Sequence, residues 1–120
     1  MQKRSMNTLI TSSPTTLRWL NSIKSKIEGK IPSLKYGDRK YWAIFKSSER
    51  NRNVVQLQPQ KRQIRLFTRL EISSNSSLEP TPASGRWAEM YPSIFLIRSE
   101  DSIDKAVELI ISSYKEDLDK

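Results

Sequence analysis

Arginine and lysine side chains are frequent in the middle of this 120-residue chain, and one phenylalanine lies among them. Arg65, Phe67 and Arg69 alternate, so their side chains are expected on one side of a strand. An aromatic ring between two cations could stack a nucleobase while the cations hold backbone phosphates. The candidate nucleic-acid-binding residues are therefore Arg39, Lys40, Arg50, Arg52, Lys61, Arg62, Arg65, Phe67 and Arg69. The alternative is that these are solvated strand and turn positions, with Phe67 covered by the long loop that follows.

Charge is divided unevenly along the chain. Residues 1–70 contain 16 Lys and Arg but 3 Asp and Glu, whereas residues 71–120 contain 5 and 10, and the formal net charge is +8. A polyanion is a plausible partner for the first part and a poor one for the second. The first part is thus expected to bind DNA or RNA, and the acidic remainder to form mostly one helix.

Catalytic chemistry has few candidates here. The chain contains no His and no Cys, which removes the usual general base, the commonest metal ligand and thiol chemistry. Glu100, Asp104 and Glu108 share one face of a predicted helix, and a solvated face is the favoured interpretation over a metal or acid–base site. The loop at 81–86 lacks the Gly spacing and Lys of a phosphate loop. We expect no enzyme activity, no cofactor and no metal.

A second set of aromatic residues also lies beside cations. Tyr36, Tyr41, Trp42 and Trp87 neighbour Lys or Arg in the sequence, which suits stacking or cation–π contacts. The favoured interpretation is structural: Trp42, Trp87 and Tyr91 are expected to close one end of the core.

The first part of the chain predicts a helix followed by a meander. Ser13 and Pro14 are typical of a helix start, and an apolar stripe that includes Leu17 and Leu20 continues to a cap at Gly29. Residues 30–40 contain proline and glycine and are predicted to be a loop. Alternating or continuous apolar runs predict strands at 41–46, 54–58, 63–70 and 93–98.

The remaining segments complete the predicted domain. Residues 73–86 are rich in Ser and Pro and predict a long surface loop. A stripe from Ile103 to Leu118 predicts a closing helix after an N-terminal signal at 99–101. The predicted fold class is α+β: one domain at 13–120, in the order α-β-β-β-β-α, with two helices on one face of a mainly antiparallel four-stranded sheet. Residues 1–12 are predicted to be a flexible basic and polar tail.

The pattern from residue 35 to about 115 resembles a known family. The matching stretches are Tyr41–Phe45, the segment from Val55 to Leu66 that contains the letters QPQKR, Ile94–Ile97, Ser99–Ile103 and Ser113-Tyr114. This order is similar to that of the small domain of unknown function labelled DUF5655, sometimes described as a predicted transport protein or found appended to nuclease-like proteins. The resemblance implies a compact α+β domain and brings no catalytic residues. The chain departs from the family at 83–89, which contains one Gly and no His.

Three functions follow as hypotheses. The leading one is a non-enzymatic domain that binds nucleic acid through its phosphate backbone with little sequence preference. The alternatives are a protein-interaction module, in which the basic middle or the acidic final helix meets an oppositely charged protein, and self-association between the two oppositely charged parts. No apolar segment approaches the roughly 20 residues that span a bilayer, so we expect no membrane partner and a cytoplasmic or nucleoid-associated location.

Overall fold

The computed structural model of the chain describes residues 11–119, so most of the predicted tail at 1–12 lies outside the described residues. The fold is α+β, as predicted, but its sheet has six strands rather than four, in the order β1-β2-β3-β4-β6-β5, with every neighbouring pair antiparallel. The strands are β1 (Leu34–Asp38), β2 (Ala43–Ser47), β3 (Arg52–Pro59), β4 (Ile64–Thr68), β5 (Glu79–Pro80) and β6 (Ser93–Ile97). The helices are α2 (Pro14–Lys30), α3 (Arg86–Met90) and α4 (Ile103–Leu118), with 3-10 turns η1 (Ile72–Ser74) and η2 (Glu100–Ser102).

Helix α2 begins where the sequence predicts. The Ser13 side chain accepts a hydrogen bond from the Thr16 backbone N–H at 3.2 Å, the Thr16 hydroxyl accepts one from the Ser13 N–H at 2.9 Å, and Pro14 occupies the first turn. The helix ends at Lys30, one residue beyond the predicted glycine cap. Leu17 was predicted to lie on the apolar stripe, but it is 36% exposed, and the sheet is contacted instead by a stripe that contains Trp19, Leu20, Ile23 and Ile27.

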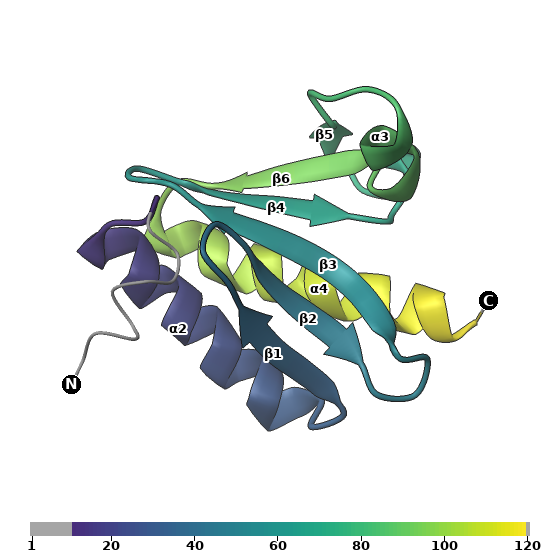
Figure 1. Cartoon of the computed structure of the whole chain (residues 1–120), viewed down its shortest axis with the longest axis horizontal. Coiled ribbons are helices and arrows are strands. Elements are labelled where there is room, and N and C mark those ends of the chain that lie inside the picture. Colours follow the sequence, from purple (N-terminus) through teal and green to yellow (C-terminus); the bar gives the residue numbers. More distant parts are fainter. Residues whose placement is uncertain (1–10, 120) are drawn as a thin grey trace.

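Helices α2 and α4 pack side by side on one face of the sheet, and the main core lies between them and the strands (Figure 1). Residues Ile103, Ala106, Val107 and Ile110 of α4 are all buried in this core, because their spacing of three and four places them on one side of the helix. No helix in the described part of the chain is both long and apolar enough to cross a membrane.

Two of the predicted loops contain strands. Residues 30–40 were predicted to be a loop because of Pro32 and Gly37, but β1 forms there, since Leu34 is fully buried and the Tyr36 ring packs on that of Phe45 at 5.5 Å. Residues 73–86 contain the end of η1 and the whole of β5, and α3 starts at the end of this segment. Strand β5 is a two-residue edge strand, a position where proline is tolerated.

The alternation predicted for the third strand is confirmed. In β4, Ile64 and Leu66 point into the main core, whereas Arg65 and Phe67 point to the opposite side of the sheet. We call this opposite side the open face. The strand residues that contribute to it are Lys35, Gly37, Ile44, Lys46, Asn53, Gln56, Gln58, Arg65, Phe67, Ile94 and Leu96.

One part of the open face is not open. Helix α3, which was not predicted, lies with β5 at one end of β6 and places Trp87 and Tyr91 against Phe67 (Figure 1). Trp42, Phe67, Trp87 and Tyr91 form a continuous aromatic cluster, with ring centroids 4.9 to 5.8 Å apart. Trp42, Trp87 and Tyr91 are thus structural as predicted, but they build a second small core on the other side of the sheet instead of closing the end of the first.

Candidate nucleic-acid interface

The turn between β1 and β2 carries two of the predicted cations. The Arg39 backbone N–H donates to the Trp42 carbonyl at 2.8 Å, which closes the turn. Arg39 and Lys40 are both exposed, and neither forms an ion pair with the residues that the structure describes. These two cations therefore remain available to a ligand.

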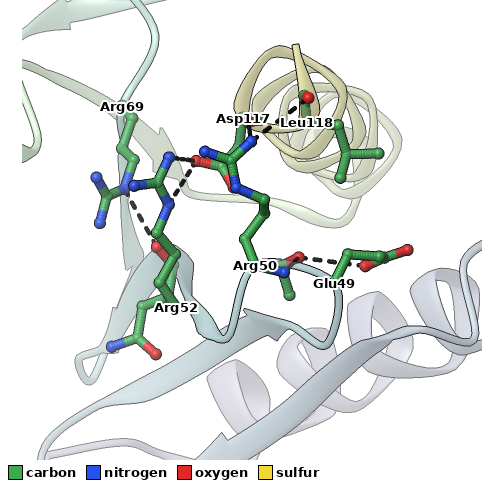
Figure 2. Close-up of polar contacts among 8 residues, drawn as sticks. Glu49, Arg50, Arg52, Arg69, Asp117 and Leu118 are labelled. Carbon is green, nitrogen blue, oxygen red and sulfur yellow. Dashed lines mark hydrogen bonds and ion pairs between the residues drawn. The ribbon is translucent and has the colours of Figure 1, made fainter. Parts of the chain in front are cut away.

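The turn between β2 and β3 uses its two arginines internally (Figure 2). The Arg50 guanidinium donates to the Asp117 carbonyl at 3.0 Å, at the end of α4, where helix carbonyls lack helical partners. The Arg52 guanidinium binds the Asp117 carboxylate, whose side chain is 3% exposed. Both guanidinium groups join the hairpin to the final helix, and phosphate binding by Arg50 and Arg52 stays a prediction.

Glu49 strengthens the same junction. Its carboxylate accepts hydrogen bonds from the Tyr114 hydroxyl at 2.5 Å and from the Ser33 hydroxyl at 2.8 Å. These bonds, with Tyr114 contributing most, lower the pKa of Glu49 to about 2 from its ordinary 4.5. Glu49, the only acid between residues 39 and 69, therefore remains ionised at neutral pH and is already bound to α4.

Lys61 and Arg62 lie at the other end of the sheet. Strand β3 separates them from Arg52 by eight residues, which at about 3.3 Å per residue is a distance of roughly 25 Å. The Lys61 ammonium donates to the Ser12 carbonyl at 3.3 Å, and the Ser13 hydroxyl donates to the Lys61 carbonyl at 2.7 Å. This turn therefore holds the start of α2, and it does not converge with the turn at Arg50 and Arg52.

The central triplet lies on the open face, but its ring is covered. Phe67 is 2% exposed beneath Trp87, so the prediction that it stacks a base is wrong for this structure. The Arg65 guanidinium lies 5.1 Å from the Phe67 ring centroid and donates a hydrogen bond to the Gln58 side chain. The Arg69 guanidinium lies 5.3 Å from the Tyr91 ring centroid and donates a hydrogen bond to the Asn53 carbonyl. Both arginines are half-buried and brace the aromatic cluster.

A pocket lies beside this cluster on the open face, over β1, β2 and β3. Its volume is about 490 Å³, within the roughly 300–1,000 Å³ typical of small-molecule sites. We call it the open-face pocket; it is lined by Gly37, Asp38, Arg39, Trp42, Ile44, Lys46, Asn53 and Gln56. Only Arg39 among the nine predicted residues lines it. Alternation from Trp42, just before β2, through Ile44 to Lys46 places these three residues on one side, and this was the signal that could have identified them.

Strand register sets the charge around the pocket. Lys35 on β1 is directly opposite Lys46 on β2, an arrangement that is unfavourable for like charges. A register shift between Phe45 and Lys46 makes Asn53 the partner of Lys46 on β3, and the Asn53 carbonyl accepts from Arg69. Lys35 and Lys46 thus lie side by side on the open face, and no ion pair involves either of them within residues 11–119.

A second pocket, of about 420 Å³, lies between the sheet and the end of α4. Arg52 and Arg69 line it together with four acids, Glu71, Glu89, Glu116 and Asp117. Because acids outnumber arginines there, this pocket is a poor site for a polyanion. Glu100 in η2 and Asp104 and Glu108 in α4 are exposed. No group of three acids that could hold a metal ion occurs within the described residues.

Comparison of the chain with protein-family models, with curated proteins and with solved structures found no match. The resemblance to DUF5655 stays a prediction.

Proposed function

We propose that this protein binds nucleic acid through the open face of its sheet, without catalysis and with little sequence preference. The observation that carries the proposal is the row of cations formed by Lys35, Lys46 and, at the β1–β2 turn, Arg39. Two lysines that face each other across a strand pair repel, and an anion between them would remove that repulsion. A row of this kind suits a chain of phosphates better than a single anion.

The proposed binding surface differs from the one expected from the sequence. Arg39, Lys40 and Arg65 are retained and Lys35 and Lys46 are added. Arg50 and Arg52 are removed because Asp117 and the end of α4 occupy them, and Arg69 is removed because it lines the acid-rich second pocket. Lys61 and Arg62 are left out because their turn holds the start of α2, although it lies at the same end of the sheet as the turn of Arg39 and Lys40. Trp42, which is half-buried and lines the pocket, replaces Phe67, which is covered, as the residue proposed to stack a base.

A salt titration tests the proposal. If three or four phosphates are neutralised on a single strand, the affinity should fall by about 20- to 50-fold between 50 and 200 mM salt. The charge reversal Lys35→Glu/Lys46→Glu should weaken binding by about tenfold or more. The control Arg18→Glu/Lys30→Glu makes the same change in net charge at exposed positions of α2 and should have a much smaller effect.

Two results would contradict the proposal. One is an affinity that does not change with salt, and the other is an equal loss in both double variants, which would mean that net charge alone attracts the nucleic acid. Capture of a protein partner that survives nuclease treatment, in the absence of any nucleic-acid binding, would favour the protein-interaction alternative.

A further inference from the structure

The open-face pocket has an unusual floor. Gly37 lies inside β1, although glycine weakens a strand interior and there often marks a close approach by a ligand. A Cβ at this position would come within 3.7 and 3.9 Å of Ile44 side-chain atoms, which also line the pocket. A side chain at residue 37 would therefore occupy the pocket above Ile44, and the glycine keeps that space free.

An aromatic wall rises beside this floor. Trp42 is half-buried, and its ring is held by Phe67 at 5.8 Å and by Trp87 at 5.2 Å between centroids. The aromatic cluster on one side of Trp42 fixes the ring, and the pocket lies on another. A ring that is already immobilised loses little conformational entropy when a flat ligand stacks on it.

Polar groups in the pocket can form hydrogen bonds with a flat heterocycle. The Gln56 amide nitrogen donates to the Tyr91 hydroxyl at 3.3 Å, so its carbonyl oxygen remains available as an acceptor. The Asn53 side-chain amide forms no hydrogen bond with the described residues. The Asp38 carboxylate also lines the pocket, but it is already hydrogen-bonded to Tyr36. Amide donors and acceptors beside an aromatic ring match the hydrogen-bonding edge of a base.

We propose that the open-face pocket takes one unstacked base of a single-stranded nucleic acid, stacked on Trp42, while Arg39, Lys46 and Lys35 hold the neighbouring phosphates. This inference rests on the proposed function and adds to it the class of nucleic acid. A base inside a duplex is paired and stacked, so it must be unpaired from its partner before it can enter the pocket, a step that a single strand does not require. The protein should therefore prefer single strands.

Fluorescence anisotropy with a labelled, mixed-sequence 12-nucleotide DNA strand tests this inference. The single strand should bind at least tenfold more tightly than its duplex at the same salt concentration. Trp42→Leu should weaken single-strand binding by about 5- to 150-fold, the fold-change equivalent to the stacking of one base. The matched control is Tyr41→Leu, an aromatic residue that is 44% exposed on the same turn but does not line the pocket; it should change binding less than twofold.

A second variant separates binding from folding. Gly37→Val places a branched side chain in the pocket at a position where a Cβ meets only ordinary contacts and where β-branched residues are favoured. It should leave the thermal midpoint equal or higher and weaken single-strand binding as much as Trp42→Leu does. Displacement of the strand by a mononucleotide at equal concentration would instead identify a free nucleotide as the ligand and would overturn the inference.

The failure of this inference is distinguishable from that of the proposed function. Salt-sensitive binding that is equal for strand and duplex, and unchanged by Trp42→Leu and Gly37→Val, would overturn the inference and leave the proposed function intact. Absence of binding to either form of nucleic acid at low salt would overturn both.

Discussion

Replacing Arg52 should destabilise the fold and reveal that this cation is structural. One oxygen of the Asp117 carboxylate accepts two hydrogen bonds from the Arg52 guanidinium, and the other carboxylate oxygen has no partner within the described residues. Arg52→Met would leave a carboxylate whose side chain is 3% exposed without its counter-charge. Breaking a buried ion pair in this way costs about 3–5 kcal/mol, and because the Arg52 side chain is 39% exposed we expect about 2–3 kcal/mol.

Urea unfolding measures this loss. With a slope of about 1–3 kcal/mol/M for a small domain, the midpoint of Arg52→Met should fall by roughly 1–2 M. Arg62→Met, the control at an exposed turn cation, should change the free energy of unfolding by less than about 0.5 kcal/mol. The double variant Arg52→Met/Asp117→Leu should recover most of the loss, because it removes the unpaired charge as well.

If Arg52→Met were no more destabilising than Arg62→Met, the structural role of the Arg52–Asp117 ion pair would be refuted. Arg52 would then be a solvated cation that is free to hold phosphate, as the sequence predicted. A double variant as unstable as Arg52→Met would also contradict this role, because lost packing of the Arg52 side chain, and not the unpaired Asp117 carboxylate, would then cause the destabilisation.

Three further predictions concern stability. Because folding lowers the pKa of Glu49 to about 2, the contribution of its carboxylate to stability is complete above pH 4.5 and is lost as the pH falls toward 2. In urea unfolding measured against pH, Glu49→Gln should therefore reduce stability at pH 7 but not at pH 2. An equal loss of stability at both pH values would argue against this role of Glu49. Gly85 has φ 73° and ψ −148°, a region open essentially to glycine, so Gly85→Ala should cost about 1–3 kcal/mol in the same assay; no change would mean that the turn relaxes freely. Asn51 has φ 53° in the β2–β3 turn, so Asn51→Ala should lower the thermal midpoint by a few degrees while Asn51→Gly should not, and the reverse order would contradict the strain assigned to this turn.

The sequence was most informative where local chemistry alone decides the structure. The N-cap at Ser13, the stripe of α4 and the alternation that begins at Ile64 each depend on neighbouring residues; the cap and the stripe are found as predicted, and the alternation is found over Ile64–Thr68. Strand β1 was missed because Gly37 reads as a loop signal, whereas pairing with β2 and burial of Leu34 determine its structure. These are tertiary effects, which outweigh intrinsic strand preference.

The candidate site was harder to predict than the fold. Which cations converge depends on strand order and register, and the sequence did not provide either. Arg50 and Arg52 are occupied by a helix end that lies 65 or more residues away, and Phe67 is covered by a helix inside a segment that resembles a loop. Lys46 and Trp42, by contrast, could have been found from the alternation in β2, because it places both on the side away from the helices.

Mapping the contact surface by nuclear magnetic resonance tests the central claim most directly. A single-stranded DNA 12-mer titrated into ¹⁵N-labelled protein at low salt should shift the amide signals of Gly37, Lys46 and Gln56 and the Trp42 indole signal, while those of Arg50 and Arg62 stay in place. Shifts gathered instead at the Arg62 turn or along α2 would contradict the account, because they would place the anion away from the open face.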